Sequence, residues 1–195
     1  MNQIFLSYRT ADERFGVALL DQELSQAFGS KAVFFASKSI APGSDWEKDM
    51  FKAVGASSAV LVVMGRNWLD AKNAAGERFV DDPRDFVRRE ITTAFDLGKR
   101  VIPVRMDAPR VSAEQLPEPL RMLPALQDIS IHFRNAKPDI DRLAARLREL
   151  IPDLPAPTAP PSRGQFTAHA SKGGVVNQYG HIDVRGDFHA GPRFG

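Results

Sequence analysis

An aromatic ring and a carboxylate lie four positions apart in the segment Asp85–Ile91 (DFVRREI). If this segment is helical, Phe86 and Glu90 lie one turn apart on the same face. Val87 and Ile91 then face the core. An aromatic ring can stack on a nucleobase, and a carboxylate can hold ribose hydroxyls or stabilise positive charge on the sugar. The pair therefore suits a nucleoside substrate, although a single helical glutamate is more commonly a solvated surface residue.

Two other segments offer groups that could bind a ligand. Arg9 directly follows the apolar segment Ile4–Tyr8, and its guanidinium can bind a phosphate or a carboxylate. A surface salt bridge is the alternative role for Arg9. The segment Ser37–Trp46 (SKSIAPGSDW) is long for a connection between a strand and a helix, where roughly 2–6 residues are usual. Long connections of this kind often bind a ligand or a partner, and a tolerated surface insertion is the alternative.

Several common site chemistries are excluded by the residues present. The chain has neither the G-x-G-x-x-G pattern of dinucleotide-binding folds nor the G-x-x-x-x-G-K-[ST] phosphate loop. The segment Met64–Arg66 lacks the phosphoacceptor aspartate of a receiver domain. With no cysteine, the chain has no disulfide, no thiolate metal site and no cysteine nucleophile. His169, His181 and His189 are spaced too widely for a metal motif, so no metal site is expected.

The charge balance bears on the class of partner. The 195 residues include 26 Lys and Arg against 24 Asp and Glu, which provides no broad cationic surface for nucleic acid. No apolar run reaches the ~20 residues that a membrane helix needs, and the N-terminal residues have no signal-peptide pattern. We therefore expect a soluble, cytoplasmic protein that binds neither nucleic acid nor membrane.

Five short segments have the apolar composition of buried strands. They are Ile4–Tyr8, Ala32–Ala36, Ala59–Met64, Val101–Val104 and Asp128–Ile131. The third is the richest in β-branched residues, which is typical of a strand that is buried on both faces. Pro103 lies in the fourth segment and suits a position near a sheet edge.

Apolar residues at helical spacing separate these strands. The four stripes are Val17, Leu20, Leu24 and Phe28; Trp46, Met50 and Val54; Val87, Ile91, Ala94 and Phe95; and Ile140, Leu143, Leu147 and Leu150. This alternation predicts an α/β fold, doubly wound and flavodoxin-like, with a five-stranded, mainly parallel sheet. Ligands bind such sheets beyond the carboxyl ends of the strands. We therefore expect the site just after Tyr8, in the loop from Ser37 and after Met64.

The composition changes at Pro152. Of the 14 prolines, six occur from that residue onward, and so do seven of the 14 glycines. The segment Pro152–Pro161 cannot sustain a helix or an internal strand, because each proline lacks an N–H and favours extended backbone before it. We expect a globular unit over residues 1–151, a Pro/Ala-rich linker over residues 152–171 and a Gly-rich tail over residues 172–195.

Four stretches of the globular unit together resemble a Toll/interleukin-1 receptor (TIR) domain, over residues 2–151. They are Ile4–Arg9 for the first strand, Ile40–Trp46 for the BB loop, Asp85–Ile91 for the third helix and Arg100–Val104 for the fourth strand. Each stretch is a loose motif, but their order and spacing match together. The resemblance implies the flavodoxin-like TIR fold.

The resemblance extends to the TIR domains that cleave NAD+, in which an aromatic residue, usually Trp, lies four residues before a catalytic Glu. It implies that Glu90 is catalytic and that Phe86 occupies the aromatic position. It also implies that Arg9, Ile40 and Trp46 line the substrate pocket. Two further aromatic residues are candidates for that lining, although core packing would explain them as well: Phe35 and Trp68. NAD+ would be the substrate, with no cofactor.

The activity implied by the resemblance is cleavage of the nicotinamide–ribose bond through an oxocarbenium-like transition state. The products would be nicotinamide and either ADP-ribose or a cyclised isomer. Family members often complete the site by stacking protomers, which implies a homo-oligomer. Two alternatives remain: a non-catalytic TIR scaffold that acts through homotypic contacts, and another N-glycosidic enzyme on a flavodoxin-like frame. Scaffold members commonly lack the glutamate that this chain has at Glu90.

The tail contains a short β-prone sequence around Val175–Gly180 (VVNQYG). Asn177 and Gln178 can form amide ladders, which are typical of cross-β assemblies. The segment from residue 172 to residue 189 resembles the short amyloid-signalling motifs of bacterial immune proteins, which are similar to the RIP homotypic interaction motif. The resemblance implies a sensor protein with a matching motif as partner. A disordered Gly-rich tail is the alternative.

Overall fold

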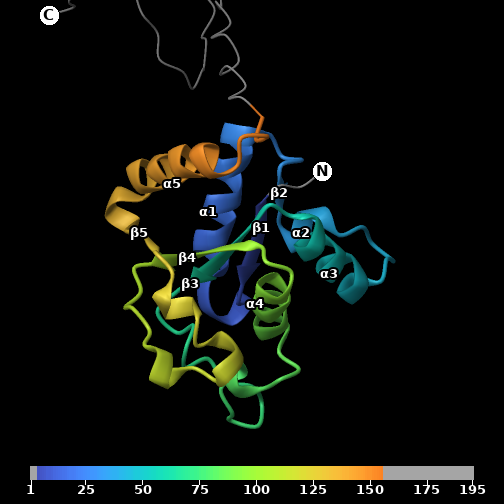
Figure 1. Ribbon diagram of the computed structural model, residues 1–195, viewed down its shortest axis with the longest axis vertical. Coiled ribbons are helices and arrows are strands. Elements are labelled where there is room, and N and C mark those ends of the chain that lie inside the picture. The colour runs from blue at the N-terminus through green and yellow to red at the C-terminus, as the bar shows by residue number, and fades with distance from the viewer. Residues whose placement is uncertain (1–3, 156–195) are drawn as a thin grey trace, which may run out of the picture. The chain divides into compact units, whose positions relative to one another are not determined.

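Five parallel strands form one sheet in the order β2-β1-β3-β4-β5 in the computed structural model, which describes residues 4–155 (Figure 1). The strands are β1 (Ile4–Tyr8), β2 (Val33–Phe34), β3 (Ala59–Met64), β4 (Arg100–Met106) and β5 (Ile129–Ile131). Every neighbouring pair is parallel, so the doubly wound α/β prediction is confirmed. The predicted tail and most of the predicted linker lie outside the described residues.

Helices cover both faces of this sheet (Figure 1). They are α1 (Thr10–Phe28), α2 (Ala36–Ser39), α3 (Trp46–Ala56), α4 (Phe86–Asp96) and α5 (Ala136–Leu150), with short 3-10 turns at Phe79–Asp81 and between β4 and α5. Helices α1 and α5 pack with the sheet in one hydrophobic core, and α3 and α4 pack in a second. Within residues 4–155, no helix is long and apolar enough to cross a bilayer.

Alternation along β1 decides which side chains reach each core. Ile4 and Leu6 belong to the core of α1 and α5, and Phe5 belongs to the core of α3 and α4. Because side chains alternate along a strand, Ser7 lies on the same face as Phe5. This alternation therefore directs the hydroxyl of a fully buried serine toward α4.

The second strand is shorter than the sequence predicts. Ala32–Ala36 was expected to be extended, but only Val33 and Phe34 pair with β1, and α2 begins at once. The backbone N–H of Phe35 donates to Ser39 Oγ at 3.1 Å, which stabilises the turn into this short helix. A local side-chain hydrogen bond thus ends the strand.

Pro103 lies near a sheet edge as the sequence predicts, because β4 is the neighbour of the edge strand β5. Pro103 pairs with Val62 of β3, whereas β5 pairs with β4 only from Val104 onward. The proline therefore precedes the stretch of β4 that has neighbours on both sides, where its missing N–H would remove a ladder hydrogen bond.

The packed unit extends past the boundary expected at residue 151. Leu154 is buried in the core of α1 and α5, and its N–H donates to the Ile151 carbonyl at 3.1 Å. This turn places the Leu154 side chain in the hydrophobic core that α1 and α5 form with the sheet. In contrast, Leu150 was expected in the apolar stripe of α5 and is 39% exposed.

The start of α1 is tied to the end of β3 by one carboxylate. Asp12 accepts the backbone N–H groups of Gly65 at 2.7 Å and Asn67 at 2.8 Å. Burial raises the Asp12 pKa, and these two hydrogen bonds oppose that rise. A Cβ at position 65 would lie 2.7 Å from Asp12 Oδ1, so the position requires glycine.

We expect Gly65→Ala to lower the free energy of unfolding by roughly 1–3 kcal/mol, because Asp12 must withdraw from two charge-assisted hydrogen bonds. Gly55→Ala is the matched control. An added Cβ there meets only Leu97 at an ordinary 3.7 Å. In a helix the change should stabilise by about 0.5–1 kcal/mol. Urea unfolding of both variants measures these changes, and equal stability of Gly65→Ala and the wild type would contradict the prediction.

Candidate functional site

A cavity of about 330 Å³ lies beyond the carboxyl end of β1, between the first turns of α3 and α4. Its lining includes Tyr8, Arg9, Trp46, Asp85, Phe86 and Glu90. The volume is at the small end of the range for ligand pockets. The position agrees with two of the three places expected for a doubly wound sheet, after Tyr8 and at the end of the loop from Ser37.

Glu90 is a buried carboxyl group on α4. Its side chain is 6% exposed, and Oε2 accepts a hydrogen bond of 2.6 Å from Ser7 Oγ. Val87, Ile91 and Ala94 anchor the same helix in the core, so the inner face of α4 carries Glu90 over β1. Glu90 therefore does not occupy the solvated surface position that is usual for a single helical glutamate.

Burial raises the pKa of Glu90 to about 8. The hydrogen bond from Ser7 lowers it, the negative charge of Asp85 raises it further, and the positive charge of Arg9 lowers it. Burial also raises the pKa of Tyr8, and the nearby Glu90 adds to that rise. At neutral pH the Glu90 side chain is therefore mainly a neutral acid, and a cation in the cavity would favour its carboxylate form.

Arg9 and Asp85 form a buried, two-pronged ion pair. The distances are 2.7 Å from Nη1 to Oδ2 and 2.8 Å from Nη2 to Oδ1, and the side chains are only 4% and 8% exposed. The rings of Trp68 and Phe79 lie 5.6 Å and 5.2 Å from the guanidinium carbon. Arg9 thus lines the cavity, but its guanidinium already binds a carboxylate of this chain.

The same aspartate begins the helix that carries Glu90. Asp85 is the N-cap of α4, and its Oδ1 accepts the Arg88 backbone N–H at 2.8 Å. Aspartate is among the preferred N-cap residues because its oxygen satisfies an N–H that the first turn leaves unpaired. One carboxylate therefore both starts α4 and binds Arg9 at the end of β1.

Two aromatic rings meet at the mouth of the cavity. Trp46 begins α3 and Phe86 begins α4, and their ring centroids lie 4.4 Å apart in an edge-to-face arrangement. Trp46 is 41% exposed and Phe86 is 37% exposed. The sequence placed Trp46, Met50 and Val54 on one helix face, and of these Met50 and Val54 are buried. The tryptophan remains available to a ligand.

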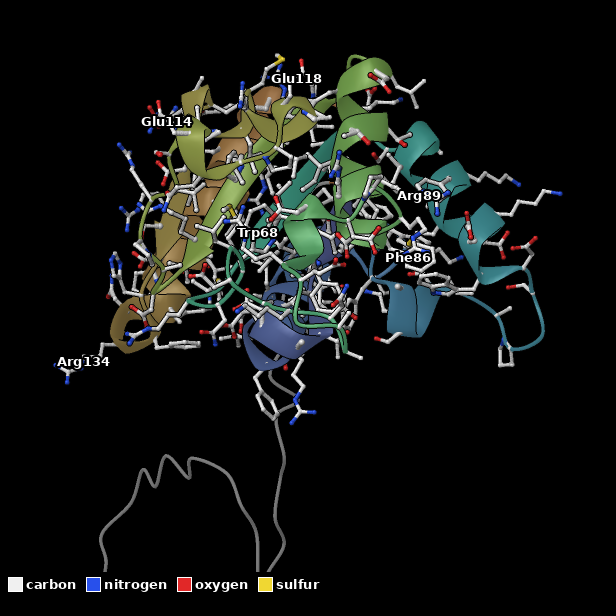
Figure 2. All side chains as sticks on the ribbon, turned by 90° about the horizontal axis from the view of Figure 1, so that it is seen from below. Trp68, Phe86, Arg89, Glu114, Glu118 and Arg134 are labelled. Carbon is white, nitrogen blue, oxygen red and sulfur yellow. The ribbon has the colours of Figure 1, made fainter. Side chains whose placement is uncertain are left out.

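Arg89 supports the outer side of Phe86. Its guanidinium carbon lies 5.5 Å from the Phe86 ring and 4.5 Å from the Phe51 ring, and Nη2 donates to Glu47 Oε1 at 2.5 Å. Figure 2 shows Phe86 and Arg89 together on α4, next to α3, with Trp68 in the interior. These contacts restrain Phe86 on the side that does not face the cavity.

The remaining candidates lie outside the lining of this cavity. Phe35 packs on Tyr8 with ring centroids 5.3 Å apart, and Ile40 packs against the core of α3 and α4. Their contact with a ligand stays a prediction. Trp68 is 1% exposed in the core, and among residues 4–155 its Nε1 has no hydrogen-bond partner.

Two residues of the site, Ser7 and Asp85, were not singled out from the sequence. Each had a signal: Ser7 is the one polar residue in the apolar segment Ile4–Tyr8 apart from its tyrosine hydroxyl, and Asp85 precedes an amphipathic stripe at a position that suits an N-cap. Neither signal indicates a partner, because both partners are distant in the sequence.

Comparison with known proteins agrees with this architecture. The family profile described as TIR domain matches residues 4–149. The chain is similar to the TIR domains of the activated Roq1 resistosome, which directly recognises the pathogen effector XopQ; the identity is 16%, covering 75% of this chain and 99% of that chain, with a TM-score of 0.57. It is also similar to a metazoan TIR-STING receptor from C. gigas in complex with 2′,3′-cGAMP; the identity is 21%, covering 72% of this chain but only 39% of the receptor, with a TM-score of 0.39. No curated protein sequence matches the chain significantly.

The buried Glu90 should make stability depend on pH. Below its unfolded pKa of 4.5, Glu90 is protonated in both the folded and the unfolded chain. Between pH 4.5 and about 8 only the unfolded chain ionises at this position, so the wild type loses stability as the pH rises. Glu90→Gln keeps an oxygen for Ser7 and has no proton to lose.

We therefore expect Glu90→Gln to be more stable than the wild type at pH 8.5, by a few kcal/mol, since each tenfold change in the proton equilibrium is worth about 1.4 kcal/mol. The difference should shrink toward pH 4.5. Denaturant unfolding across this range measures it. Glu118→Gln is the control, because Glu118 is exposed (Figure 2). If the stability difference between Glu90→Gln and the wild type did not change with pH, the prediction that Glu90 is buried and protonated would be contradicted.

Proposed function

This chain belongs to the TIR domain family, and we propose that it hydrolyses NAD+ at the bond between nicotinamide and ribose. The observation that carries the proposal is Glu90, a buried carboxyl group lining a cavity whose mouth is formed by two aromatic rings. In this proposal Glu90 is the catalytic residue, and NAD+ is the substrate without any further cofactor.

The size of the cavity favours one half of this substrate. A volume of about 330 Å³ suits a nicotinamide riboside group better than a whole dinucleotide. Phe86 and Trp46 would stack on the substrate at the mouth, and the rest of NAD+ would extend outside. TIR domains that cleave NAD+ usually have Trp at the position of Phe86. Here Trp46 supplies a second ring beside the smaller phenylalanine.

The chemistry follows from the charge of the substrate. Nicotinamide is cationic in NAD+, and its approach would lower the pKa of Glu90 and favour the carboxylate. As the C–N bond breaks, its electron pair passes to the nicotinamide nitrogen and positive charge develops on the ribose. The Glu90 carboxylate would hold the ribose hydroxyls and stabilise this charge. Attack of water on the anomeric carbon, with loss of a proton, yields ADP-ribose; attack by a group of the adenine yields a cyclic product.

The proposal includes self-association in the cytoplasm as the activating step of a signalling or immune effector. The cavity is small, and the residues before Trp46, from Ala41 to Asp45, are exposed and free to meet a second copy. The resistosome that contains the similar TIR domains is an activated assembly. The tail over residues 172–195 would cluster the chain, alone or with a sensor protein that has the same motif.

Glu90 provides the direct test of catalysis. We expect Glu90→Gln and Glu90→Ala to abolish nicotinamide release, while Glu118→Gln retains it. Because the carboxylate is the active form, kcat/KM should rise with pH and level off above about pH 8, the pKa of Glu90 in the free protein. A coupled assay of nicotinamide over pH 5.5–9.5 measures both effects. Release by Glu90→Ala that equals wild-type release would favour a non-catalytic TIR scaffold.

Self-association has a separate test. The turnover per chain should increase with protein concentration, and fusion to a dimerising or oligomerising domain should raise it at low concentration. A chain that ends at residue 155 should lose the concentration dependence that the tail contributes and recover activity on forced clustering. Light scattering and thioflavin fluorescence, measured beside nicotinamide release, report the assembly. Equal turnover per chain at every concentration, with or without fusion, would contradict activation by clustering.

A further inference from the structure

Two buried contacts join β1 to α4, and they lie side by side. Ser7 and Arg9 are two residues apart on the chain at β1, and they contact Glu90 and Asp85, which are five residues apart at α4. Arg9 directly follows the last residue of β1, and Asp85 is the N-cap of α4. Both contacts are therefore made at once between the carboxyl end of β1 and the start of α4.

Two polar contacts between β1 and α4 restrain the start of the helix more than one contact does. Val87, Ile91 and Ala94 anchor α4 in the core, and the hydrogen bond between Ser7 and Glu90 is one polar contact that leaves the start of the helix unrestrained. The second contact, Arg9 with Asp85, has two donors and two acceptors in a planar arrangement that tolerates little rotation. Because Asp85 is also the N-cap, the ion pair acts on the first turn of the helix and therefore on everything the helix carries.

We propose that the Arg9–Asp85 ion pair is a positioning device that joins the end of β1 to the start of α4 and so holds Glu90 against Ser7. The proposal rests on the proposed function only where it concerns catalysis; the placement of Glu90 is a property of the folded chain. Arg9 and Asp85 are then positioning residues, and Glu90 remains the catalytic one.

The contacts of Arg9 argue against a direct role in substrate binding. Both Nη groups donate to Asp85, and Nε is buried without a hydrogen-bond partner among residues 4–155. Because Asp85 neutralises Arg9 and only 4% of the Arg9 side chain is exposed, a substrate phosphate could use the full charge of Arg9 only by displacing Asp85, the cap of α4. The aromatic rings of Trp68 and Phe79 also pack against the guanidinium. Arg9 therefore acts on the site through Asp85.

The pair also determines the electric field at Glu90. The polar groups that act on Glu90 are Ser7 and Tyr8 of β1, Arg9 directly after β1, and Asp85 at the N-cap of α4. Asp85 raises the pKa of Glu90 and Arg9 lowers it, so the two charges act in opposite directions. Low exposure leaves little water to screen either charge. Loss of one partner should thus shift the proton equilibrium of Glu90 in a direction that depends on which partner is lost.

The test measures the Glu90 pKa directly by carbon-13 NMR of the side-chain carboxyl in the full chain, with Glu90→Gln to assign the signal. We expect Asp85→Asn to lower the pKa of Glu90 and Arg9→Gln to raise it, each by roughly 0.5–1.5. The double variant should return close to the wild-type value. Asparagine is as good an N-cap as aspartate, so Asp85→Asn removes the charge and keeps the cap.

Asp139→Asn is the matched control. Asp139 is also a buried carboxylate in the first turn of a helix, 3% exposed, and it accepts the His132 backbone N–H at 2.9 Å. It belongs to α5, which packs in the other hydrophobic core. This variant should lose stability without moving the Glu90 pKa. Loss of stability alone is therefore distinguished from loss of positioning.

Kinetics separate positioning from substrate binding. If Arg9 only positions Glu90, the Arg9 and Asp85 variants should lower kcat by roughly 10–100-fold, because misplacement by about 1 Å costs that much, with KM nearly unchanged. A rise in KM at unchanged kcat would overturn the proposal and return Arg9 to the substrate site. If the wild type releases no nicotinamide, the proposed function fails, and the NMR result still decides the positioning role.

Three outcomes of the NMR test would overturn the proposal. They are shifts of the same sign in both single variants, no shift in either, and an equal shift in Asp139→Asn. If a single variant fails to fold, the neutral pair in Arg9→Gln/Asp85→Asn decides: wild-type kcat in that folded protein would show that the ion pair is dispensable. A lowered kcat with an unchanged KM and a Glu90 pKa near the wild-type value would support the proposal.

Discussion

A carboxyl group buried against the central strand is the constraint on which this site depends. Glu90 is buried over β1 near the Arg9–Asp85 ion pair, and its carboxyl group accepts a hydrogen bond from Ser7. Desolvation makes the ionised form costly, so the group stays protonated at neutral pH unless positive charge comes near. A buried acid of this kind lowers the stability of the folded chain at neutral pH, and it suits a ligand with positive charge. Buried titratable groups at functional sites commonly cost stability in this way.

The neighbouring ion pair makes this arrangement possible. Arg9 and Asp85 bring opposite charges to the same buried region, and these charges shift the pKa of Glu90 in opposite directions. The same ion pair joins the carboxyl end of β1 to the start of α4, the helix that carries Glu90 and Phe86. Asp12 similarly joins α1 to the loop after β3, because it accepts the backbone N–H groups of Gly65 and Asn67. One carboxylate thus caps the helix that lines the cavity, and the other joins the start of α1 to the segment after β3.

Much of the fold could be predicted from the residue pattern. The apolar stripe of α1, from Val17 to Phe28, is buried throughout, and β1 and β3 have the predicted bounds. An error occurs where a local contact overrides the pattern: the Phe35 N–H donates to Ser39, and β2 ends at Phe34. Of the candidate site residues, the cavity brings together Glu90, Phe86, Trp46 and Arg9, and the lining does not include Phe35 or Ile40.

The sequence by itself determined the fold class and the four-residue spacing of Phe86 and Glu90, because periodicity and spacing are local properties of the chain. Only the tertiary structure decided that Glu90 is buried and mainly protonated at neutral pH, and that Arg9 binds Asp85. Both facts depend on which face of β1 meets α4 and on partners that are far apart in the chain. Burial and the charges of such partners set the pKa of a group, and neither can be read from its neighbours in sequence.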